Sequence, residues 1–304
     1  MNNPQRILIG GAGGFVGGAL ESYLRKRGHT VERLSRSRDG KGIYWDIENE
    51  YLDPNALSSF DAVISLAGQN IFTRWTSANM LEITSSRVKS ARTINKAIAA
   101  APNPPKVFLC ASAVGYYGLN PNYTDENSPG GEGFLAEVCR QWEKASNLLP
   151  TSTRVVNMRF GLIMDNSGGF FAKFAKALDW HIRPIFGDGS IFFSWIALAD
   201  LCRAVEFAIE NRSLEGPVNF SSARPCSYLE LARASAHLKK ISIPIKIPSL
   251  LMRLFMGQMA SELIFSYVRA KPKKLLEGGF KFLSPNIDSF IESVALAREQ
   301  AQST

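Results

Sequence analysis

A glycine-rich run near the start of the chain constrains the fold more than any other feature of the sequence. Residues 10–17 read GGAGGFVG, directly after an apolar segment typical of a buried strand and directly before an apolar stripe with helical period. Gly11, Gly14 and Gly17 are spaced three apart, which permits a tight turn and close packing of helix on strand. They also let the backbone approach a pyrophosphate at the positive end of the helix. We expect dinucleotide binding here, the alternative being a turn with a purely structural role.

Strand and helix patterns alternate through the first half of the chain. The expected strands are residues 6–10, 30–34, 43–45, 62–66, 106–110 and 154–158. The expected helices are residues 15–24, 77–100 and 134–149. This alternation predicts an α/β fold, a doubly wound parallel sheet of the Rossmann type with helices on both faces.

The pattern changes after about residue 165. Glycine-rich turns replace the regular alternation, and the tail, residues 245–304, is expected to be helical with Pro and Gly breaks and no clear strand. We therefore expect a smaller, mainly helical C-terminal lobe on the substrate side. The expected domains are residues 1–165, which bind the cofactor, and residues 166–304, with the segment near 198–221 returning to the sheet.

The composition argues against several classes of protein. With 304 residues the chain is long enough to bury a large core without a disulfide or metal support. Its four cysteines form no CxxC pair, and its three histidines have no carboxylate or cysteine partner at ligand spacing, so we expect reduced thiols and no metal. No apolar run approaches the ~20 residues of a membrane span, and no signal-peptide core is present. We expect a cytoplasmic protein without membrane binding.

The chain is basic, with a net charge of +8. Its basic residues gather within residues 1–41 and 269–274. Nucleic-acid binding favours a continuous basic stripe with interleaved aromatic residues, and neither cluster has that pattern. We therefore expect solvated basic surfaces, a small-molecule substrate as the partner, and a monomer or homodimer.

The end of the second expected strand bears on the choice of cofactor. An NAD site places Asp or Glu there to bind the ribose 2′-hydroxyl, but this chain has Ser35, Arg36 and Ser37, with no acid until Asp39. The guanidinium of Arg36 is a forked, permanent cation that suits a 2′-phosphate, and the two serines add hydroxyls. We favour NADP(H), the alternative being that Arg36 and Arg38 are surface arginines.

Further motifs follow in a fixed order along the chain. They are DAVISLAG at residues 61–68, SAVGYYG at 112–118, WE at 142–143, RFG at 159–161, SWI at 194–196, and PKKLL with GF at 272–280. In this order they resemble the extended short-chain dehydrogenase/reductases and, more narrowly, the NADP-binding epimerase family proteins, which are similar to NAD-dependent epimerases and dehydratases. The resemblance implies a Rossmann domain that binds NADP(H) and a small C-terminal domain specific to the family.

The resemblance also implies positions for the cofactor contacts. Leu66, Ala67 and Gly68 would pass under the adenosine, and Asp46 would lie near the adenine. Glu82 and Arg87 stand on one helix, where an ordinary ion pair is the alternative. The full set of expected cofactor contacts is Gly11, Gly14, Phe15, Val16, Gly17, Ser35, Arg36, Ser37, Asp46, Leu66, Ala67, Gly68, Glu82, Arg87, Val138 and Arg159.

The catalytic residues depart from the pattern of the superfamily. Members that oxidise or reduce a carbinol use Tyr and Lys spaced YxxxK on one helical face, but residues 133–143 contain neither residue in register, and the Lys position falls on Val138 or Cys139. The remaining expected acid–base residues are Ser112, Tyr116 and Glu137.

Each of these catalytic residues has a structural alternative. Tyr116 and its neighbour Tyr117 could pack under the lobe, Ser112 could cap a loop, and Glu137 could be a surface charge. Trp195 is expected to line a substrate cleft with Ser112, Tyr116 and Arg159, or to belong to the core.

Two functions follow from the sequence and the resemblance. The first is an NADP(H)-dependent oxidoreductase or nucleotide-sugar-epimerase-like enzyme of unknown substrate. The second is a non-catalytic NADP(H)-sensing regulator, because some members of the family that the chain resembles are named cell-division inhibitors. The absent Tyr/Lys pair favours the second function, and the intact cleft motifs favour the first.

Overall fold

The computed structural model describes residues 4–238 and 242–302. The chain divides into two compact units, which we call the first unit and the second unit. The first unit comprises Met1–Tyr116, Glu137–Arg159 and Cys202–Val218. The second unit comprises Tyr117–Ala136, Phe160–Leu201 and Asn219–Thr304. The domain boundary near residue 165 that the sequence favours stays a prediction.

A parallel sheet forms the centre of the first unit. Among the described residues it has eight strands in the order β13-β8-β6-β5-β1-β2-β3-β4. These are β1 (Arg6–Gly10), β2 (Thr30–Ser35), β3 (Ile43–Asp46), β4 (Tyr51–Leu52), β5 (Ala62–Ser65), β6 (Val107–Ala113), β8 (Arg154–Phe160) and β13 (Gly216–Phe220). β1 runs parallel to β2 and β5, β5 runs parallel to β6, and only the short edge strand β4 is shown antiparallel to its neighbour. The predicted doubly wound α/β sheet is confirmed.

The strand order fixes where a ligand can bind. It reverses direction between β1 and β5, and their register places Gly10 opposite Ser65. The carboxyl ends of these two strands therefore form the switch point, at which doubly wound sheets bind their ligands.

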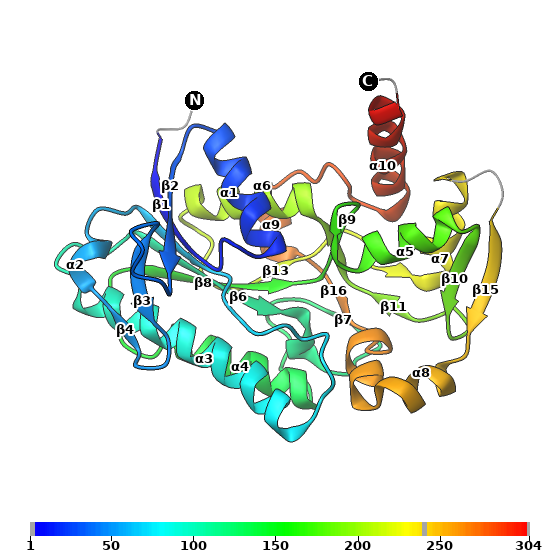
Figure 1. Ribbon diagram of the computed structural model, residues 1–304, viewed down its shortest axis with the longest axis horizontal. Coiled ribbons are helices and arrows are strands. Elements are labelled where there is room, and N and C mark those ends of the chain that lie inside the picture. The colour runs from blue at the N-terminus through cyan, green and yellow to red at the C-terminus, as the bar shows by residue number, and fades with distance from the viewer. Residues whose placement is uncertain (1–3, 239–241, 303–304) are drawn as a thin grey trace. The chain divides into compact units, whose positions relative to one another are not determined.

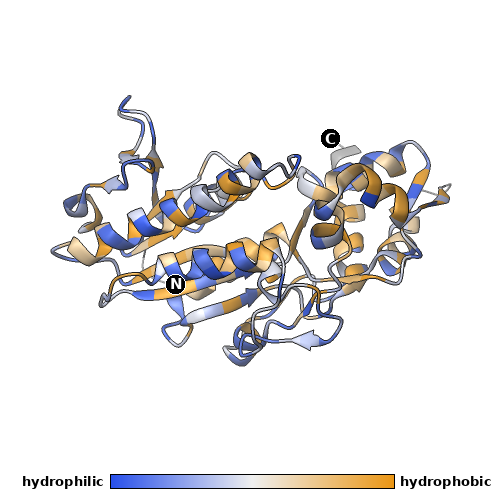
Figure 2. Ribbon diagram, turned by 90° about the horizontal axis from the view of Figure 1, so that it is seen from below, coloured by the Kyte–Doolittle hydropathy of each residue, from blue (hydrophilic) through white to orange (hydrophobic). Residues whose placement is uncertain are grey.

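Helices cover both faces of this sheet (Figure 1). They are α1 (Phe15–Lys26), α2 (Pro54–Leu57), α3 (Ser77–Ala100), α4 (Phe134–Ser146) and α6 (Leu198–Glu210). In Figure 1, α1 and α6 lie on one face, and α3 and α4 on the other. Figure 2 shows hydrophobic and hydrophilic segments alternating along the helices, as expected of helices with one buried side. In α1 the buried side includes Leu20 and Leu24.

The central strands β1 and β5 are apolar on both faces because both faces are covered. Ile7, Leu8 and Ile9 of β1 are fully buried, and so are Val63 and Ile64 of β5. Such continuous apolar runs are typical of parallel strands between two helical layers. This burial fixes the carboxyl edge of the sheet on which the candidate site is built.

The second unit combines short strand pairs with helices. The pairs are β9 (Leu162–Asp165) with β12 (Trp195–Ala197), β10 (Ile182–Phe186) with β15 (Ile243–Ile247), β11 (Phe192–Phe193) with β14 (Cys226–Ser227), and β7 (Tyr123–Thr124) with β16 (Arg269–Ala270). The helices are α5 (Gly169–Asp179), α7 (Tyr228–Ala234), α8 (Ser249–Met256), α9 (Lys273–Glu277) and α10 (Ile287–Gln302). Buried aromatic residues, among them Phe171 and Phe290 with ring centroids 4.8 Å apart, fill its core.

Two features of the second unit bear on the sequence predictions. Residues 227–230 read SYLE, a pattern typical of a capping box, and the capping box of Ser227 and Glu230 is present at the start of α7. The expectation of no strand in the tail is wrong, because β15 pairs with β10 and β16 pairs with β7. Ile243, Ile245 and Ile247 alternate with Pro244 and Lys246 in β15, so the sequence carries a short strand pattern, although a proline and a largely exposed surface are atypical of a strand.

Within the described residues, we find no helix with both the length and the apolar character needed to cross a membrane. All four cysteines are buried with free thiols.

Candidate functional site

The glycine-rich loop lies at the switch point, between the end of β1 and the start of α1. Gly11 has a backbone φ of +85°, and a Cβ at this position would lie 2.8 Å from the carbonyl carbon of Leu66. A Cβ at Gly17 would overlap the carbonyl oxygen of Gly11. Only glycine therefore fits at both positions, which brings the loop against the segment after β5 and α1 against the loop.

The first turn of α1 has the features of an anion site. In the described structure its N-cap, Gly14, provides no side-chain cap, and its first turn holds no acidic residue. A Cβ at Gly13 would meet nothing within 4 Å. The N–H groups of an uncapped helix start beside an open glycine loop suit a phosphate oxygen. The residues present therefore fit the pyrophosphate of a dinucleotide.

The end of β2 presents a free guanidinium. Arg36 is exposed, and it makes no hydrogen bond or ion pair with any residue that the structure describes. Arg38, by contrast, lies over the ring of Tyr44, with its Cζ 3.9 Å from the ring centroid. Ser35 Oγ accepts a hydrogen bond from the backbone N–H of Ser37 at 3.1 Å, which shapes the turn. Of the two arginines, Arg36 is the one available to a 2′-phosphate.

Asp46 lies in β3, next to the end of β2. Its carboxylate accepts hydrogen bonds from Asn49 N and Nδ2, at 3.0 and 2.8 Å. These bonds hold the pKa of Asp46 below its usual range, so the side chain is an anion that can accept a hydrogen bond from the adenosine.

Arg87 of α3 lies against the segment after β5. Its Nη1 donates to the carbonyl oxygens of Gln69 and Ile83, both at 3.0 Å, and its Cζ lies 5.2 Å from the centroid of the Trp142 ring. A Cβ at Gly68 would lie 3.1 Å from Arg87 Cγ, so glycine provides the space for this side chain. Burial lowers the pKa of the guanidinium, which still carries its charge at neutral pH.

The alternative of an ion pair between Arg87 and Glu82 is wrong. Every hydrogen bond that Arg87 makes within the described chain goes to a backbone carbonyl, and Glu82 is exposed. A half-buried cation without a carboxylate partner among the described residues can offset the charge of a bound phosphate.

A closed polar cluster joins the ends of β6 and β8 to α4. Ser112 Oγ donates to Glu143 Oε1 at 2.7 Å, and Arg159 binds both carboxylate oxygens of Glu143, with Nε and Nη2 each at 2.8 Å. The Cζ of Arg159 lies 3.5 Å from the centroid of the Tyr116 ring. Ser112 and Arg159 are each only 2% exposed, so the ion pair is shielded from water.

Sequence reasoning missed Glu143, although it lies in the WE motif that supported the resemblance. The cluster holds the Ser112 hydroxyl as a donor to a carboxylate and fixes the ring of Tyr116 under a cation. It can therefore orient two hydroxyl groups beside the carboxyl edge of the sheet, where no Tyr/Lys pair is present.

The three neighbouring positions on α4 differ in environment. Glu137 is exposed, and hydrogen bonds from Gln141 and Arg140 hold its pKa below the usual range. Val138 and Cys139 are buried, and burial raises the pKa of the Cys139 thiol to about 11. Neither Val138 nor Cys139 offers a charged group in place of a lysine.

The aromatic residues Tyr117 and Trp195 belong to the second unit. The buried Tyr117 hydroxyl donates to Asn219 Oδ1 at 2.8 Å. Trp195 is fully buried, its Nε1 donates to the carbonyl of Arg224, and its ring lies against Phe290. The expectation that Trp195 lines a cleft is therefore wrong, and its alternative, a core tryptophan, holds.

His29 has a carboxylate partner in the fold that lies far outside any ligand spacing in the sequence. His29 Nε2 lies 3.3 Å from Glu206 Oε1, and Glu210 completes a group of potential ligand atoms within 4.8 Å of one another. The N–H of Gln5 donates to His29 Nδ1, so Nε2 carries the proton and points it at Glu206. Arg27 also donates to Glu206. Donors already surround this carboxylate, which makes the group a structural hydrogen-bond network.

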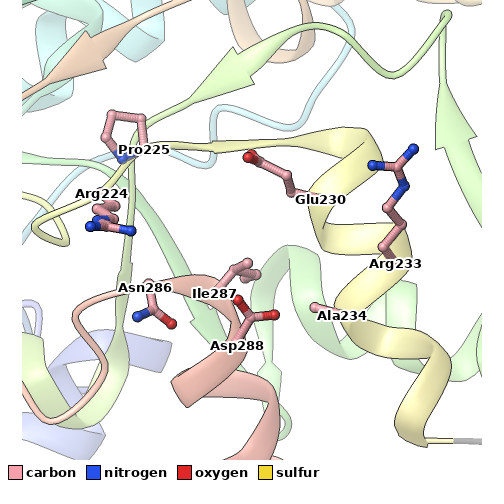
Figure 3. Close-up of a pocket in the computed structure, with 8 residues that line it drawn as sticks. All are labelled: Arg224, Pro225, Glu230, Arg233, Ala234, Asn286, Ile287 and Asp288. Atoms are coloured by element: carbon pink, nitrogen blue, oxygen red, sulfur yellow. The ribbon is translucent and has the colours of Figure 1, made fainter.

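A pocket of about 260 Å³ opens in the second unit beside α7 and α10 (Figure 3). Exposed side chains of both signs line it, Arg224 and Arg233 with Glu230 and Asp288. It contains none of the residues that the sequence predicts for the cofactor or for catalysis, and we assign no ligand to it.

Comparison with known proteins places these features in a family. Residues 7–220 match the NAD dependent epimerase/dehydratase family, and residues 247–294 match a domain of unknown function, DUF1731. The chain belongs to the NAD dependent epimerase/dehydratase family. The resemblance inferred from the sequence motifs is confirmed.

Relatives of this epimerase/dehydratase family chain match over nearly its whole length. An epimerase family protein of Mycobacterium bovis is 34% identical over 281 residues, which cover 91% of this chain and 93% of the relative. Human epimerase family protein SDR39U1 is 30% identical over 295 residues, covering 95% and 99%.

Solved structures show the same fold. The crystal structure of human SDR39U1 with NADPH has a TM-score of 0.88 and 30% identity, and it covers 95% of this chain and 99% of that chain. A nucleoside-diphosphate sugar epimerase from Corynebacterium glutamicum has a TM-score of 0.75 and 27% identity, covering 98% of this chain and 58% of that chain.

Proposed function

We propose that this chain is an NADP(H)-dependent oxidoreductase or epimerase-like enzyme of the short-chain dehydrogenase/reductase superfamily. The observation that carries the proposal is the uncapped start of α1 beside a glycine loop at the switch point, together with the unpaired Arg36 after β2. The structure of human SDR39U1 with NADPH supports the choice of cofactor.

Different residues around the switch point contact different parts of the cofactor in this proposal. The N–H groups of the first turn of α1, at Phe15, Val16 and Gly17, bind the pyrophosphate. Arg36 binds the 2′-phosphate of the adenosine ribose through its forked donors, and Ser35 and Ser37 add hydroxyls.

The segment from Leu66 to Gly68 would hold the adenosine, Asp46 would accept a hydrogen bond near the adenine, and Arg87 would offset phosphate charge. When bound, NADPH supplies a hydride, and the protein must move the accompanying proton.

We assign the proton step to Ser112 and Tyr116. Glu143 accepts from the Ser112 hydroxyl and holds Arg159 under the Tyr116 ring, so Glu143 and Arg159 act as positioning residues. Glu137 is the other candidate for the general base, although the hydrogen bonds from Gln141 and Arg140 that lower its pKa also make it a weaker base. The free thiols support the expectation of a reducing, cytoplasmic setting.

The test measures binding and turnover separately. NADPH binding is followed by nicotinamide fluorescence, and NADPH consumption is followed with a panel of aldehydes, quinones and nucleotide sugars. Tyr116→Phe should lower turnover about 10²–10⁴-fold with little change in NADPH affinity, because it removes only a proton donor. Tyr267→Phe is the control, since Tyr267 is exposed and its hydroxyl has no partner among the described residues.

The regulatory alternative makes a different prediction for the same assay. Tight NADPH binding with no turnover on any substrate of the panel would favour a non-catalytic NADP(H) sensor. Failure to bind either reduced pyridine nucleotide would refute both functions.

A further inference from the structure

Helix α8 presents a continuous set of apolar side chains to solvent. None of its residues is buried. Leu250, Leu254 and Phe255 are 77%, 76% and 83% exposed, and Leu251 is 47% exposed. These four residues are spaced i, i+1, i+4 and i+5, so they lie on one side of the helix, and we call them the α8 face. Figure 1 shows α8 at the margin of the second unit, after β15.

The opposite side of α8 already packs on the second unit. Met252 and Met256, four residues apart, pack against its buried aromatic core. A helix that is apolar on two opposite sides is typically covered on both of them. The four side chains of the α8 face present on the order of 500 Å² of apolar surface. An exposed apolar area of that size is often a contact site for a protein or a membrane.

The charged residues within this segment are all cations. Residues 242–261 contain Lys246 and Arg253 and no acidic residue, and both cationic side chains are exposed. Around the helix, Arg253 lies between the α8 face and Met256, with its Cζ 5.7 Å from the centroid of the Phe265 ring. An arginine at the border of an apolar face can lay its aliphatic stem along that face while its guanidinium stays in a polar layer.

Acidic residues near this segment are held by other groups. Hydrogen bonds from Ser190 N and Oγ, with a smaller contribution from the charge of Lys246, hold the pKa of Asp188 below its usual range. The carboxylate of Glu262 accepts hydrogen bonds from two backbone N–H groups at the start of α4. Arg253 makes no ion pair with any described residue. The α8 face is therefore bordered by an uncompensated positive charge, which complements an anionic surface.

The same features disfavour a second copy of this chain as the occupant. In a two-fold contact the α8 face would meet itself, so each Arg253 would lie near the Arg253 of the other copy. Within the described residues the neighbouring strand β15 pairs with β10 alone. Pro244 and Lys246 in β15 discourage the addition of a further strand at its open edge.

We propose that the α8 face binds the surface of an anionic membrane. Its four apolar side chains enter the boundary between head groups and acyl chains, and Arg253 and Lys246 contact anionic head groups. α8 then lies in the plane of the membrane surface. The sequence expectation of no membrane binding rested on the absence of a spanning run and a signal peptide, and neither is needed by a helix of this kind. The proposal does not rest on the proposed function.

Sedimentation of the full chain with vesicles tests this proposal. Vesicles of phosphatidylcholine alone are compared with vesicles of phosphatidylcholine and phosphatidylserine in equal amounts. The natural protein should bind the mixed vesicles at least about tenfold more tightly, because anionic lipids attract its cations. Arg253→Gln should weaken binding to the mixed vesicles about fivefold and binding to the neutral vesicles little. The double variant Leu254→Gln with Phe255→Gln should weaken binding to the mixed vesicles at least about tenfold, because it removes apolar anchors.

Matched controls come from the second unit itself. Leu296 on α10 is 60% exposed, so Leu296→Gln removes a comparably exposed leucine outside the α8 face. Arg233 on α7 is exposed, so Arg233→Gln changes the net charge as Arg253→Gln does. Neither control should change vesicle binding strongly. Melting temperatures check that every variant keeps its fold.

Three results would overturn the proposal. The first is no sedimentation with either kind of vesicle. The second is vesicle binding that the double variant retains, which would place the contact elsewhere on this basic chain. The third is a dimer, seen by light scattering, that the double variant abolishes in a protein that binds no vesicles, since a second copy would then cover the α8 face. NADPH fluorescence on the same preparations reports on the proposed function separately.

Discussion

The buried ion pair between Glu143 and Arg159 should contribute strongly to stability as long as both partners are present. Two of its N–O distances are 2.8 Å, and the side chains are only 3% and 12% exposed for Arg159 and Glu143. At an effective dielectric constant of about 20, two unit charges at this distance attract by about 6 kcal/mol before desolvation is subtracted. Glu143→Gln keeps the size of the side chain but leaves the Arg159 charge buried and unpaired. We expect a loss of about 3–5 kcal/mol in the free energy of unfolding.

The same helix provides a control. Glu137 lies 2.7 Å from Arg140, but these side chains are 51% and 40% exposed. Because water replaces the partner there, Glu137→Gln should cost less than about 1 kcal/mol. Urea denaturation followed by circular dichroism measures both variants. The double variant Glu143→Met with Arg159→Met should lose less than the sum of the two single Met variants, because it leaves no unpaired charge. If Glu143→Gln were no more destabilising than Glu137→Gln, the reasoning from burial would be refuted.

Two further predictions concern the cofactor and pH. Arg36→Ala should weaken NADPH binding at least about tenfold and NADH binding little, because only NADPH carries the 2′-phosphate. The control variant Arg38→Ala should change the affinity for neither nucleotide strongly. Fluorescence titrations with NADPH and NADH measure both affinities, and equal weakening of the two by Arg36→Ala would contradict the assignment. Burial tends to raise the pKa of Glu206, but three side-chain donors outweigh it and hold the folded pKa below the ordinary 4.5. The stability that the Glu206 carboxylate contributes is therefore complete above pH 4.5 and is lost as the pH falls through the lower folded pKa. The melting temperature of Glu206→Gln should fall less steeply with decreasing pH than that of the natural protein. Parallel plots of melting temperature against pH for the two proteins would rule out this linkage.

Much of the fold could be predicted from local patterns. The helix expected at residues 77–100 has those bounds, and Thr76 caps its first turn through a side-chain hydrogen bond to Asn79 N. The expected strand at residues 6–10 also has the observed bounds. Periodicity, caps and glycine spacing act over a few residues, so the bounds of these elements can be predicted directly from the sequence.

The ends of the later elements were less predictable. The strand expected at 106–110 continues as β6 to Ala113, and the helix expected at 134–149 ends at Ser146. The pairing of β6 with β5 covers only Val107–Cys110, so the last three residues of β6 lie beyond this register.

The sequence by itself determined the glycine loop, the arginine after the second strand and the missing Tyr/Lys pair, because each is a matter of residue type at close spacing. Tertiary structure alone decided which charges meet. Glu143 contacts Ser112 and Arg159, which are 31 and 16 residues away, and His29 contacts Glu206 across 177 residues. Whether a charged side chain has a partner depends on how segments distant in sequence pack together, so no short sequence pattern predicts it.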